Sequence, residues 1–572
     1  MKLSRWITLA AALASTAFAA NLELTIDPVF NGEPLRLDSL RYETSSKETI
    51  SVTRLSYLLS GFALECAEGQ WTEVPDTIAW IDATSRRNRI LLEGLPAGKF
   101  RSIRFHVGPD AKANAADFTQ YPAGHPLNPN LNGLHWSWQG GYIFMAIEGH
   151  YRIGNTEPKG YAHHLARDPN RTRIILSAPL ALSHDAGMLL HFDIATLLNA
   201  PRPLSFEQDG DSTHSREGDP VSAVLVANLP GAFRVHRIAS SAPMLEKLSP
   251  VTPIDLPDKF TPYRFTMSRT FPMPDLPRDN PLIEERIALG EKLFHDKALS
   301  RDGTISCATC HQADAAFADR LKTSQGIDGR TGDRNSMPLF NLAWKREFFW
   351  DGRAKSLREQ VLMPIEDHRE MDESIERVVE KLSASSDYAP LFNSAYRSPG
   401  ITAEKISLAL EQFLLTLSAR NSRFDRAMAG RDSLTDEEKR GFELFMTEYE
   451  PRTGQYGADC FHCHGGALFT DHQFHNNGLI GDDRGRAAVT GSAADEHKFS
   501  TPSLRNVALT APYMHDGRFA TLEEVVEHYS SGVHRSETLD PNLAKHPEKG
   551  LNLSTEDKAA LVAFLKTLTE SQ

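Results

Sequence analysis

The sequence predicts a multidomain protein, in which an all-β, sandwich-like domain is followed by two mainly α-helical domains. Its 572 residues exceed the ~100–200 that one domain usually has. The N-terminal part alternates apolar and polar residues in short runs, as half-buried strands do, whereas the later part spaces its apolar residues as helices do. The later part also carries two copies of one short cysteine–histidine motif, which indicates a duplicated unit.

Composition and charge exclude some classes of protein. Hydrophobic residues make up 40% of the chain and charged residues 24%, which is ordinary for globular domains and unlike disordered or fibrous chains. The net charge is −13 and no block of Lys or Arg stands out, so the sequence offers no phosphate-neutralising surface and no nucleic acid partner is expected.

The first nineteen residues have the pattern of a signal peptide. Lys2 and Arg5 precede an apolar run from Trp6 to Ala14, and Ala17-Phe18-Ala19 fits a cleavage site after Ala19. A membrane anchor is the alternative, but the run is shorter than the ~20 residues of a membrane span, and no other stretch reaches that length. We therefore expect residues 1–19 to be removed and the mature protein to be periplasmic, with no membrane span.

Residues 20–240 are expected to form the β domain. Leu22, Leu24 and Ile26 alternate with polar residues, and Gly, Pro, Asn and Asp clusters separate such runs, as in β-sandwiches and barrels. Five prolines between Ala242 and Arg264 predict an extended linker over residues 241–265, because proline interrupts helices and central strands.

The helical part is expected to divide into two domains, 266–430 and 431–572. Its final helix is the clearest, because Ser554 can cap a run in which Leu561, Phe564, Leu565 and Leu568 follow the spacing of one buried face.

Two Cys-x-x-Cys-His units carry the strongest chemical signal. They are Cys307-Ala308-Thr309-Cys310-His311 and Cys460-Phe461-His462-Cys463-His464. Two thiols at this spacing can bind the two vinyl groups of one porphyrin while the next histidine ligates the iron, which predicts two covalent c-type haems. A zinc site would need a fourth ligand, and a redox dithiol would need no adjoining histidine.

An internal repeat follows each motif. Asp351-Gly352-Arg353-Ala354-Lys355-Ser356-Leu357 recurs as Asp516-Gly517-Arg518-Phe519-Ala520-Thr521-Leu522. In this register Pro364 corresponds to Tyr529. A phenol oxygen can ligate iron and a proline cannot, so the repeat predicts a closed second haem and an open first one; an ordinary buried tyrosine is the alternative.

From about Pro281 onward the chain resembles the bacterial di-haem cytochrome c peroxidase superfamily. The resemblance rests on Leu299-Ser300, Ser306-Cys307, Phe349-Trp350-Asp351-Gly352-Arg353-Ala354 and Thr501-Pro502-Ser503-Leu504-Arg505-Asn506. Tyr529 makes it similar to the MauG and MbnH branch, in which a tyrosine ligates the second haem. The loop between Gln312 and Arg334 contains no histidine, so it cannot supply the distal ligand that other peroxidases of the superfamily use.

The resemblance implies further roles. Trp350 would relay charge between the haems, Gln360 and Glu370 would handle peroxide at the open haem beside Pro364, and Asn335, Thr510 and Pro512 would bind Ca²⁺. Taken alone, Trp350 reads as a core aromatic and Glu370 as a solvated helix charge.

The N-terminal part resembles the MbnP family of copper-binding proteins. The resemblance rests on Tyr57-Leu58-Leu59-Ser60, Val107-Gly108-Pro109-Asp110, Trp136-Ser137-Trp138 with Gly141-Tyr142, and His163-His164. It implies that Trp136 or Trp138 is oxidised to kynurenine beside a copper ion; packing in the core is the alternative. Imidazole suits copper, and the candidate ligands are His164, His135, His163 and His214. We expect no functional role for Cys66.

These resemblances together predict an oxidoreductase fused to its own substrate. Hydrogen peroxide would react at the first haem, and high-valent iron would oxidise a tryptophan of the N-terminal domain to kynurenine and so mature a copper site. The alternatives are a di-haem peroxidase that takes electrons from a small cytochrome, and a copper carrier whose haems only move electrons. The sequence leaves open which tryptophan reacts, whether oxidation occurs within one chain, the copper ligands, the electron donor or acceptor and the oligomeric state.

Overall fold

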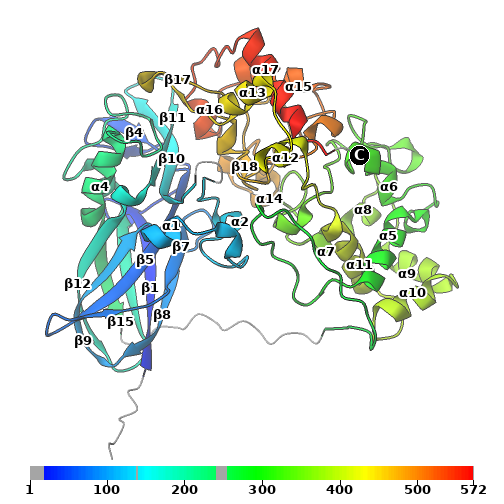
Figure 1. The fold of residues 1–572 in the computed structure, drawn as a ribbon, viewed down its shortest axis with the longest axis horizontal. Coiled ribbons are helices and arrows are strands. Elements are labelled where there is room, and N and C mark those ends of the chain that lie inside the picture. Colours follow the sequence, from blue (N-terminus) through cyan, green and yellow to red (C-terminus); the bar gives the residue numbers. More distant parts are fainter. Residues whose placement is uncertain (1–18, 137–139, 240–253, 571–572) are drawn as a thin grey trace, which may run out of the picture.

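The computed structural model describes residues 19–136, 140–239 and 254–570. The predicted signal peptide, except Ala19, and most of the predicted linker lie outside these residues, as does Trp138. Figure 1 shows a β domain, coloured blue to cyan, beside a helical half in which the yellow-to-red part lies nearer to the β domain than most of the green part. No helix within the described ranges combines the length and the apolar character of a membrane span.

The β domain consists of two sheets around one core, so the predicted all-β, sandwich-like fold is confirmed. One sheet has the order β15-β13-β1-β2 with β8 also paired to β1, and the other is built on the path β12-β9-β5-β10-β11-β14. Its strands are β1 (Ala19–Phe30), β2 (Glu33–Pro34), β3 (Tyr42–Glu43), β4 (Glu48–Ile50), β5 (Arg54–Cys66), β6 (Trp71–Glu73), β7 (Ile78–Asp82), β8 (Arg89–Pro96), β9 (Gly98–Val107), β10 (Ile143–Ile153), β11 (Lys159–Ala166), β12 (Thr172–Leu182), β13 (Ala186–Asp193), β14 (Ser212–Thr213) and β15 (Phe233–Ala239).

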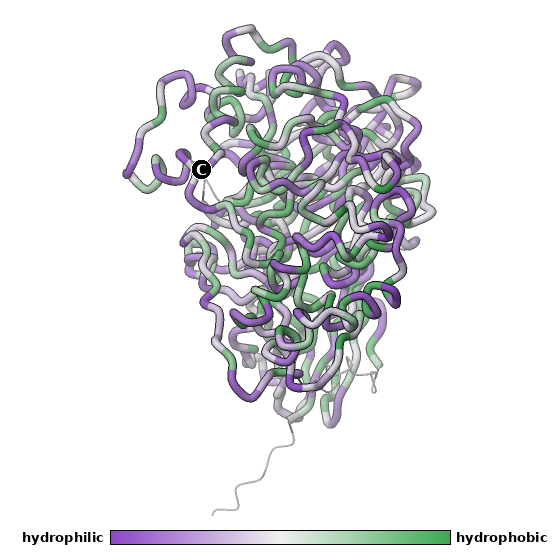
Figure 2. Tube along the Cα trace, turned by 90° about the vertical axis from the view of Figure 1, so that its right-hand side faces the viewer, coloured by the Kyte–Doolittle hydropathy of each residue, from purple (hydrophilic) through white to green (hydrophobic). Residues whose placement is uncertain are grey.

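Alternation along the strands explains this core. Leu22, Leu24 and Ile26 of β1 are completely buried, as the sequence predicts. Buried and exposed residues alternate along β12, because successive side chains point to opposite faces of a sheet. Figure 2 shows hydrophobic and hydrophilic segments alternating along the whole trace.

Four short helices complete the β domain. They are α1 (Ala111–Asn114), α2 (Pro129–Asn132), α3 (Ile194–Asn199) and α4 (Pro220–Ala232). Cys66 ends β5 and is partly buried against the core as a free thiol.

The helical half has two main cores, one for each cysteine–histidine motif. The first is built from α5 (Glu284–His295), α6 (Cys307–Cys310), α7 (Leu357–Gln360), α8 (Met363–Glu366), α9 (Ile375–Ala384), α10 (Tyr388–Ala395) and α11 (Ala403–Thr416). The second contains α12 (Arg423–Met428), α13 (Asp436–Phe445), α14 (Ala487–Thr490), α15 (Leu522–Glu527), α16 (Pro541–Ala544), α17 (Thr555–Thr567) and the short strands β16 (Tyr449–Glu450), β17 (Gln455–Tyr456), β18 (Phe474–His475) and β19 (Phe499–Ser500).

Each half is closed by a pair of crossing helices, α5 with α11 and α13 with α17. A glycine lies at both crossings: a Cβ on Gly290 would be 2.0 Å from the Ala409 carbonyl oxygen, and one on Gly441 would be 1.9 Å from that of Ala560. Only glycine allows the two backbones to approach this closely. The duplication predicted from the motifs therefore extends to the helix packing.

The repeated Asp-Gly-Arg segments adopt the same turn. Phe348 pairs with Ala354 around the first, and Tyr513 pairs with Phe519 around the second. The central glycines have φ of 71° and 63°, a left-handed conformation that favours glycine. This shared turn supports the register that matches Pro364 with Tyr529.

Candidate functional site

Both cysteine–histidine motifs orient their histidine through a backbone carbonyl oxygen. His311 Nδ1 donates a hydrogen bond to the Phe317 carbonyl oxygen at 2.9 Å, and His464 Nδ1 donates one to that of Phe469 at 3.1 Å. Each bond fixes the ring and leaves Nε2 free for an iron atom. All four motif cysteines, Cys307, Cys310, Cys460 and Cys463, are free thiols and so are available for thioether bonds.

The first motif is accompanied by Glu370. Burial and the nearby Asp367 raise the pKa of its carboxyl to about 7, against the opposing effect of Arg353 and Arg369. Its charge in turn contributes to the raised pKa values of Cys307 and Cys310, so the carboxyl lies within electrostatic reach of the motif. A carboxyl with a pKa near neutrality can both give and take a proton.

Gln360 and Pro364 lie on the same segment as Glu370. Gln360 ends α7, Pro364 lies in α8, and both are half-buried. The Pro364 carbonyl oxygen accepts a hydrogen bond from the Met371 backbone, which ties this turn to the residue after Glu370. Pro364 offers no ligand atom in its side chain, in agreement with an open position at the first haem.

The second motif is accompanied by Tyr529. This residue lies in a π-helical turn, His528–Gly532, that directly continues α15, and such turns are frequent at functional sites. Burial raises the pKa of its phenol to about 12, with Cys463 and Cys460 contributing to the rise. The Asn477 side-chain amide donates to the phenol oxygen at 3.4 Å. Within the described chain, this long hydrogen bond from Asn477 is the one polar contact of the phenol oxygen.

Trp350 joins the two halves. Its indole Nε1 donates to the Asn335 carbonyl oxygen at 2.8 Å, and its own carbonyl oxygen accepts from the Ser500 backbone, which belongs to the second half. It is 9% exposed. A buried tryptophan whose indole bonds the first half and whose backbone bonds the second is suited to relay charge between them.

Asn335 is also anchored to the second half, because its backbone N–H donates to the His515 carbonyl oxygen at 2.7 Å. The Thr510 hydroxyl donates to the Val507 carbonyl oxygen, and Pro512 follows a cis peptide bond. A Ca²⁺ ion held by Asn335, Thr510 and Pro512 stays a prediction.

The decisive feature is the paired arrangement: two haem-attachment motifs with oriented histidines, a half-buried carboxyl at the first and a half-buried phenol at the second. Residues 284–433 match the family model described as di-haem cytochrome c peroxidase. Methylamine utilization protein MauG from Methylorubrum extorquens is 41% identical over 51% of this chain and 80% of its own length. The chain belongs to the di-haem cytochrome c peroxidase family.

Two further similar proteins have lower identity to this chain. Cytochrome c551 peroxidase from Pseudomonas aeruginosa is 33% identical over 52% of this chain and 82% of its own length. A crystal structure of a MauG-like protein associated with microbial copper homeostasis is 34% identical, with a TM-score of 0.49, over 54% of this chain and 96% of that one. Like MauG and cytochrome c551 peroxidase, this chain is a di-haem oxidoreductase of the peroxidase type.

The N-terminal domain matches a different family model. Residues 19–215 match the family model MbnP. The chain is therefore a fusion of an MbnP-like β domain with a di-haem cytochrome c peroxidase, as the sequence predicts.

The predicted copper ligands fall into two groups. His164 of β11 and His214, directly after β14, have ring centroids 5.1 Å apart, because β11 and β14 pair in parallel and bring the two residues to the same place. His163 points elsewhere, stacks on Phe206 and bonds the Gly210 carbonyl oxygen. His135 packs between Phe118 and Tyr142. Neither joins the potential metal clusters of the described residues.

Trp136 lies at the edge of the His164–His214 pair. Its ring centroid is 5.5 Å from that of His214, and it is partly buried against the β-domain core. A pocket of about 290 Å³ borders it, lined also by Asn114, Tyr142 and Arg167. Among the described residues, Trp136 therefore combines contact with histidine and access for small molecules.

Sequence reasoning missed His462, the spacer residue of the second motif. It lies at the interface with the β domain, with its ring centroid 5.3 Å from that of His214 and 5.7 Å from that of His164. Burial and Lys545 act against its charged form, but Glu448 and Asp459 raise its pKa to about 9. One feature of the sequence could have indicated it: His462, a possible metal ligand, occupies the position that Thr309 holds in the first motif.

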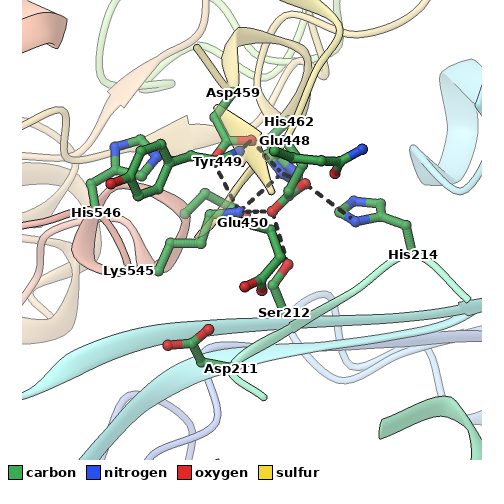
Figure 3. Close-up of polar contacts among 12 residues, drawn as sticks. Asp211, Ser212, His214, Glu448, Tyr449, Glu450, Asp459, His462, Lys545 and His546 are labelled. Carbon is green, nitrogen blue, oxygen red and sulfur yellow. Dashed lines mark hydrogen bonds and ion pairs between the residues drawn. The ribbon is translucent and has the colours of Figure 1, made fainter. Parts of the chain in front are cut away.

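Figure 3 shows the buried polar cluster around Glu448 at this interface. Glu448 accepts from the Ser212 hydroxyl at 2.8 Å, pairs with Lys545, and lies 3.2 Å from His214 Nδ1 and 3.1 Å from His462 Nε2. Asp459 lies on the other side of Lys545, at 3.1 Å. These paired charges join the β domain to the second haem domain.

Three further contacts hold the same interface. His150 Nε2 donates to the Leu539 carbonyl oxygen at 2.9 Å, and Arg452 pairs with Asp211 at 3.1 Å. A Cβ on Gly160 would be 1.8 Å from the Pro541 carbonyl oxygen, so α16 lies directly on β11. The β domain thus has a fixed position against the second motif.

Proposed function

We propose that this protein uses hydrogen peroxide to oxidise Trp136 of its own β domain to kynurenine, which matures a copper site beside that residue. The observation that carries the proposal is the contact series from Trp136 to His214, and from His214 to Phe461 and His462 inside the second haem-attachment motif. The substrate residue and the second haem site are separated by a single histidine ring.

The chain's own residues have separate tasks in this reaction. Bound haems supply the iron that exchanges electrons with peroxide. Glu370, with a pKa near 7, moves a proton between the peroxide oxygens, and Gln360 orients the peroxide. Trp350 carries electrons from the second half to the first. Tyr529 would ligate the second haem through its phenol oxygen. Trp136 is the terminal electron donor.

Oxidation of each tryptophan to kynurenine requires two molecules of hydrogen peroxide. Tryptophan and two peroxides give N-formylkynurenine and two waters, and one further water releases formate and leaves kynurenine. The pocket beside Trp136 admits water to the indole, whereas the peroxide reacts at the other half of the molecule. The interface contacts support oxidation within one chain, because they hold the substrate residue next to the second motif.

The test is mass spectrometry of the peptide that contains Trp136 and Trp138, before and after treatment with two equivalents of peroxide. We expect the gain of one oxygen and the loss of one carbon at Trp136. The Trp138→Phe variant should react as the parent does, and the Trp136→Phe variant should not. An unchanged peptide after the peroxide is consumed would reject the proposal.

A second function is favoured by the 33% identity to cytochrome c551 peroxidase. In that case the protein reduces peroxide with electrons from a small cytochrome, and the β domain serves as a docking module. Rapid oxidation of reduced cytochrome c in steady state, with Trp136 left intact, would favour this function. Export to the periplasm applies to both functions and is tested by the N-terminal sequence of the mature protein.

A further inference from the structure

Three histidines from two domains meet at the interface. His164 and His214 belong to the β domain, and His462 belongs to the second haem-attachment motif. One ring nitrogen from each lies within 4.8 Å of the other two. The side chains of His164 and His462 are 4% and 3% exposed, and that of His214 is 12% exposed. Three imidazoles so close together in a buried place can converge on one metal ion.

Two of these rings have a nitrogen that lacks a partner. His164 Nδ1 and His214 Nε2 are buried and make no hydrogen bond within the described chain. A buried polar atom without a partner carries a free-energy cost, and native structures usually satisfy it. Both nitrogens can therefore accept a metal ion as their partner.

Each of the three rings also has a nitrogen that faces a carboxylate. His164 Nε2 donates to Glu148 at 2.9 Å, and His214 Nδ1 and His462 Nε2 lie 3.2 and 3.1 Å from the same oxygen of Glu448. A carboxylate on the far nitrogen is the usual outer partner of a metal-binding histidine, because it fixes the ring and increases its basicity. All three rings have such a partner.

The carboxylates are themselves held. Arg54 donates to Glu148 at 2.9 Å, and Asn542 of the second haem domain donates to its other oxygen at 3.4 Å. Glu448 is held by Ser212 and Lys545. The support for the three rings thus also comes from both domains.

We infer that His164, His214 and His462 form a tris-histidine copper site shared between the β domain and the second haem domain. Three imidazoles suit Cu²⁺ and also Zn²⁺, and the choice of copper rests on the proposed function. The site is complete only when the two domains are docked.

The position of His462 couples this site to the second haem. It lies between Cys460 and Cys463, the two haem-binding cysteines of that motif. A copper ion on His462 therefore changes the charge next to the second haem and leaves the first unaffected. The coupling gives a spectroscopic signature that a site confined to the β domain would lack.

The decisive variant is His462→Thr. Thr309 holds the corresponding position in the first motif, so this exchange keeps a spacer that haem attachment accepts. The full-length di-haem protein, never exposed to peroxide, is titrated with CuCl₂. We expect the variant to lose at least the roughly 10–100-fold in affinity that removal of an outer partner alone costs. The matched control is His163→Gln, which changes the neighbouring buried histidine and should bind copper as the parent does.

Electron paramagnetic resonance keeps the test independent of folding. The parent protein with one equivalent of Cu²⁺ should show coupling to three nitrogens, and His462→Thr should show two. Unchanged affinity and an unchanged spectrum in His462→Thr, or two nitrogens in the parent, would overturn the inference. Because tryptophan is intact throughout, a protein that forms no kynurenine can still show the His462 effect, so the failure of the proposed function remains separate.

Discussion

The two haem-attachment motifs hold their cofactors in the same way and differ in what surrounds them. Each orients its histidine through a backbone carbonyl and is followed by the same Asp-Gly-Arg turn. The first has Thr309 as a spacer and Pro364 downstream, whereas the second has His462 and Tyr529 at the matching positions. The difference teaches that a duplicated unit keeps the residues that bind its cofactor and changes those that face its neighbours.

The largest effect on activity is expected from a substitution beside the first haem-attachment motif. Glu370→Gln removes the proton carrier, and positioned acid–base groups contribute roughly 100- to 10,000-fold to rate. Peroxide consumption, followed by absorbance, should fall by that amount. Glu366→Gln, an exposed carboxyl on the same segment, is the control and should retain the parent rate. If Glu370→Gln consumes peroxide normally, the first half is not the peroxide site.

Tyr529→Phe tests the second half. Loss of the phenol oxygen should reduce oxidation of the Trp136 peptide by roughly tenfold or more, or at least 1.4 kcal/mol in the barrier. Peroxide consumption at the first half should change less. Tyr513→Phe is the matched control, because its hydroxyl bonds only the Val507 carbonyl oxygen among the partners that the structure gives it. Equal losses in both variants would show that Tyr529 has only a packing role.

The pH dependence sharpens the comparison between the halves. The pKa of Glu370 is raised to about 7, so its carboxylate form is lost as pH falls through that value. Peroxide consumption should therefore level off above about pH 7 and decrease by roughly tenfold per unit below it. Stopped-flow measurements from pH 5 to pH 9 would show this profile, and Tyr529→Phe should preserve it. A profile that is flat through pH 7 would assign the proton step to another group.

The smallest effect is expected at the domain interface. Gly160→Ala places a Cβ against the Pro541 carbonyl oxygen, and overpacking of this kind costs about 1–3 kcal/mol. Limited proteolysis between the domains should become several-fold faster, and oxidation of Trp136 slower, while peroxide consumption is retained. Gly124→Ala is the control, since no atom lies within 4 Å of its added Cβ. Unchanged proteolysis would mean that the interface does not depend on this contact.

Much of this molecule could be predicted from local patterns. Alternation identified β1, helical spacing identified α17, and the two motifs identified the haem sites, because each of these signals lies within a short stretch of sequence. The repeat also placed Pro364 and Tyr529 at equivalent positions without any structure.

The interface could not be predicted in this way. His164, His214 and His462 are brought together by the pairing of β11 with β14 and by the docking of two domains, and neither event leaves a periodic signal. His462 was hidden in a spacer that has no fixed requirement. His135 and His163, which sequence context made candidates, are turned away by ordinary core packing.

The burial of His462 and Phe461 under the β domain also sets an order of assembly. Phe461 is 9% exposed and the side chain of His462 is 3% exposed, and both lie between the cysteines that must react with the porphyrin. An enzyme that attaches haem cannot reach this segment once the β domain covers it. The β domain precedes the second motif along the chain, so its own core forms first. Its docking onto the second haem domain then follows the attachment of the second haem.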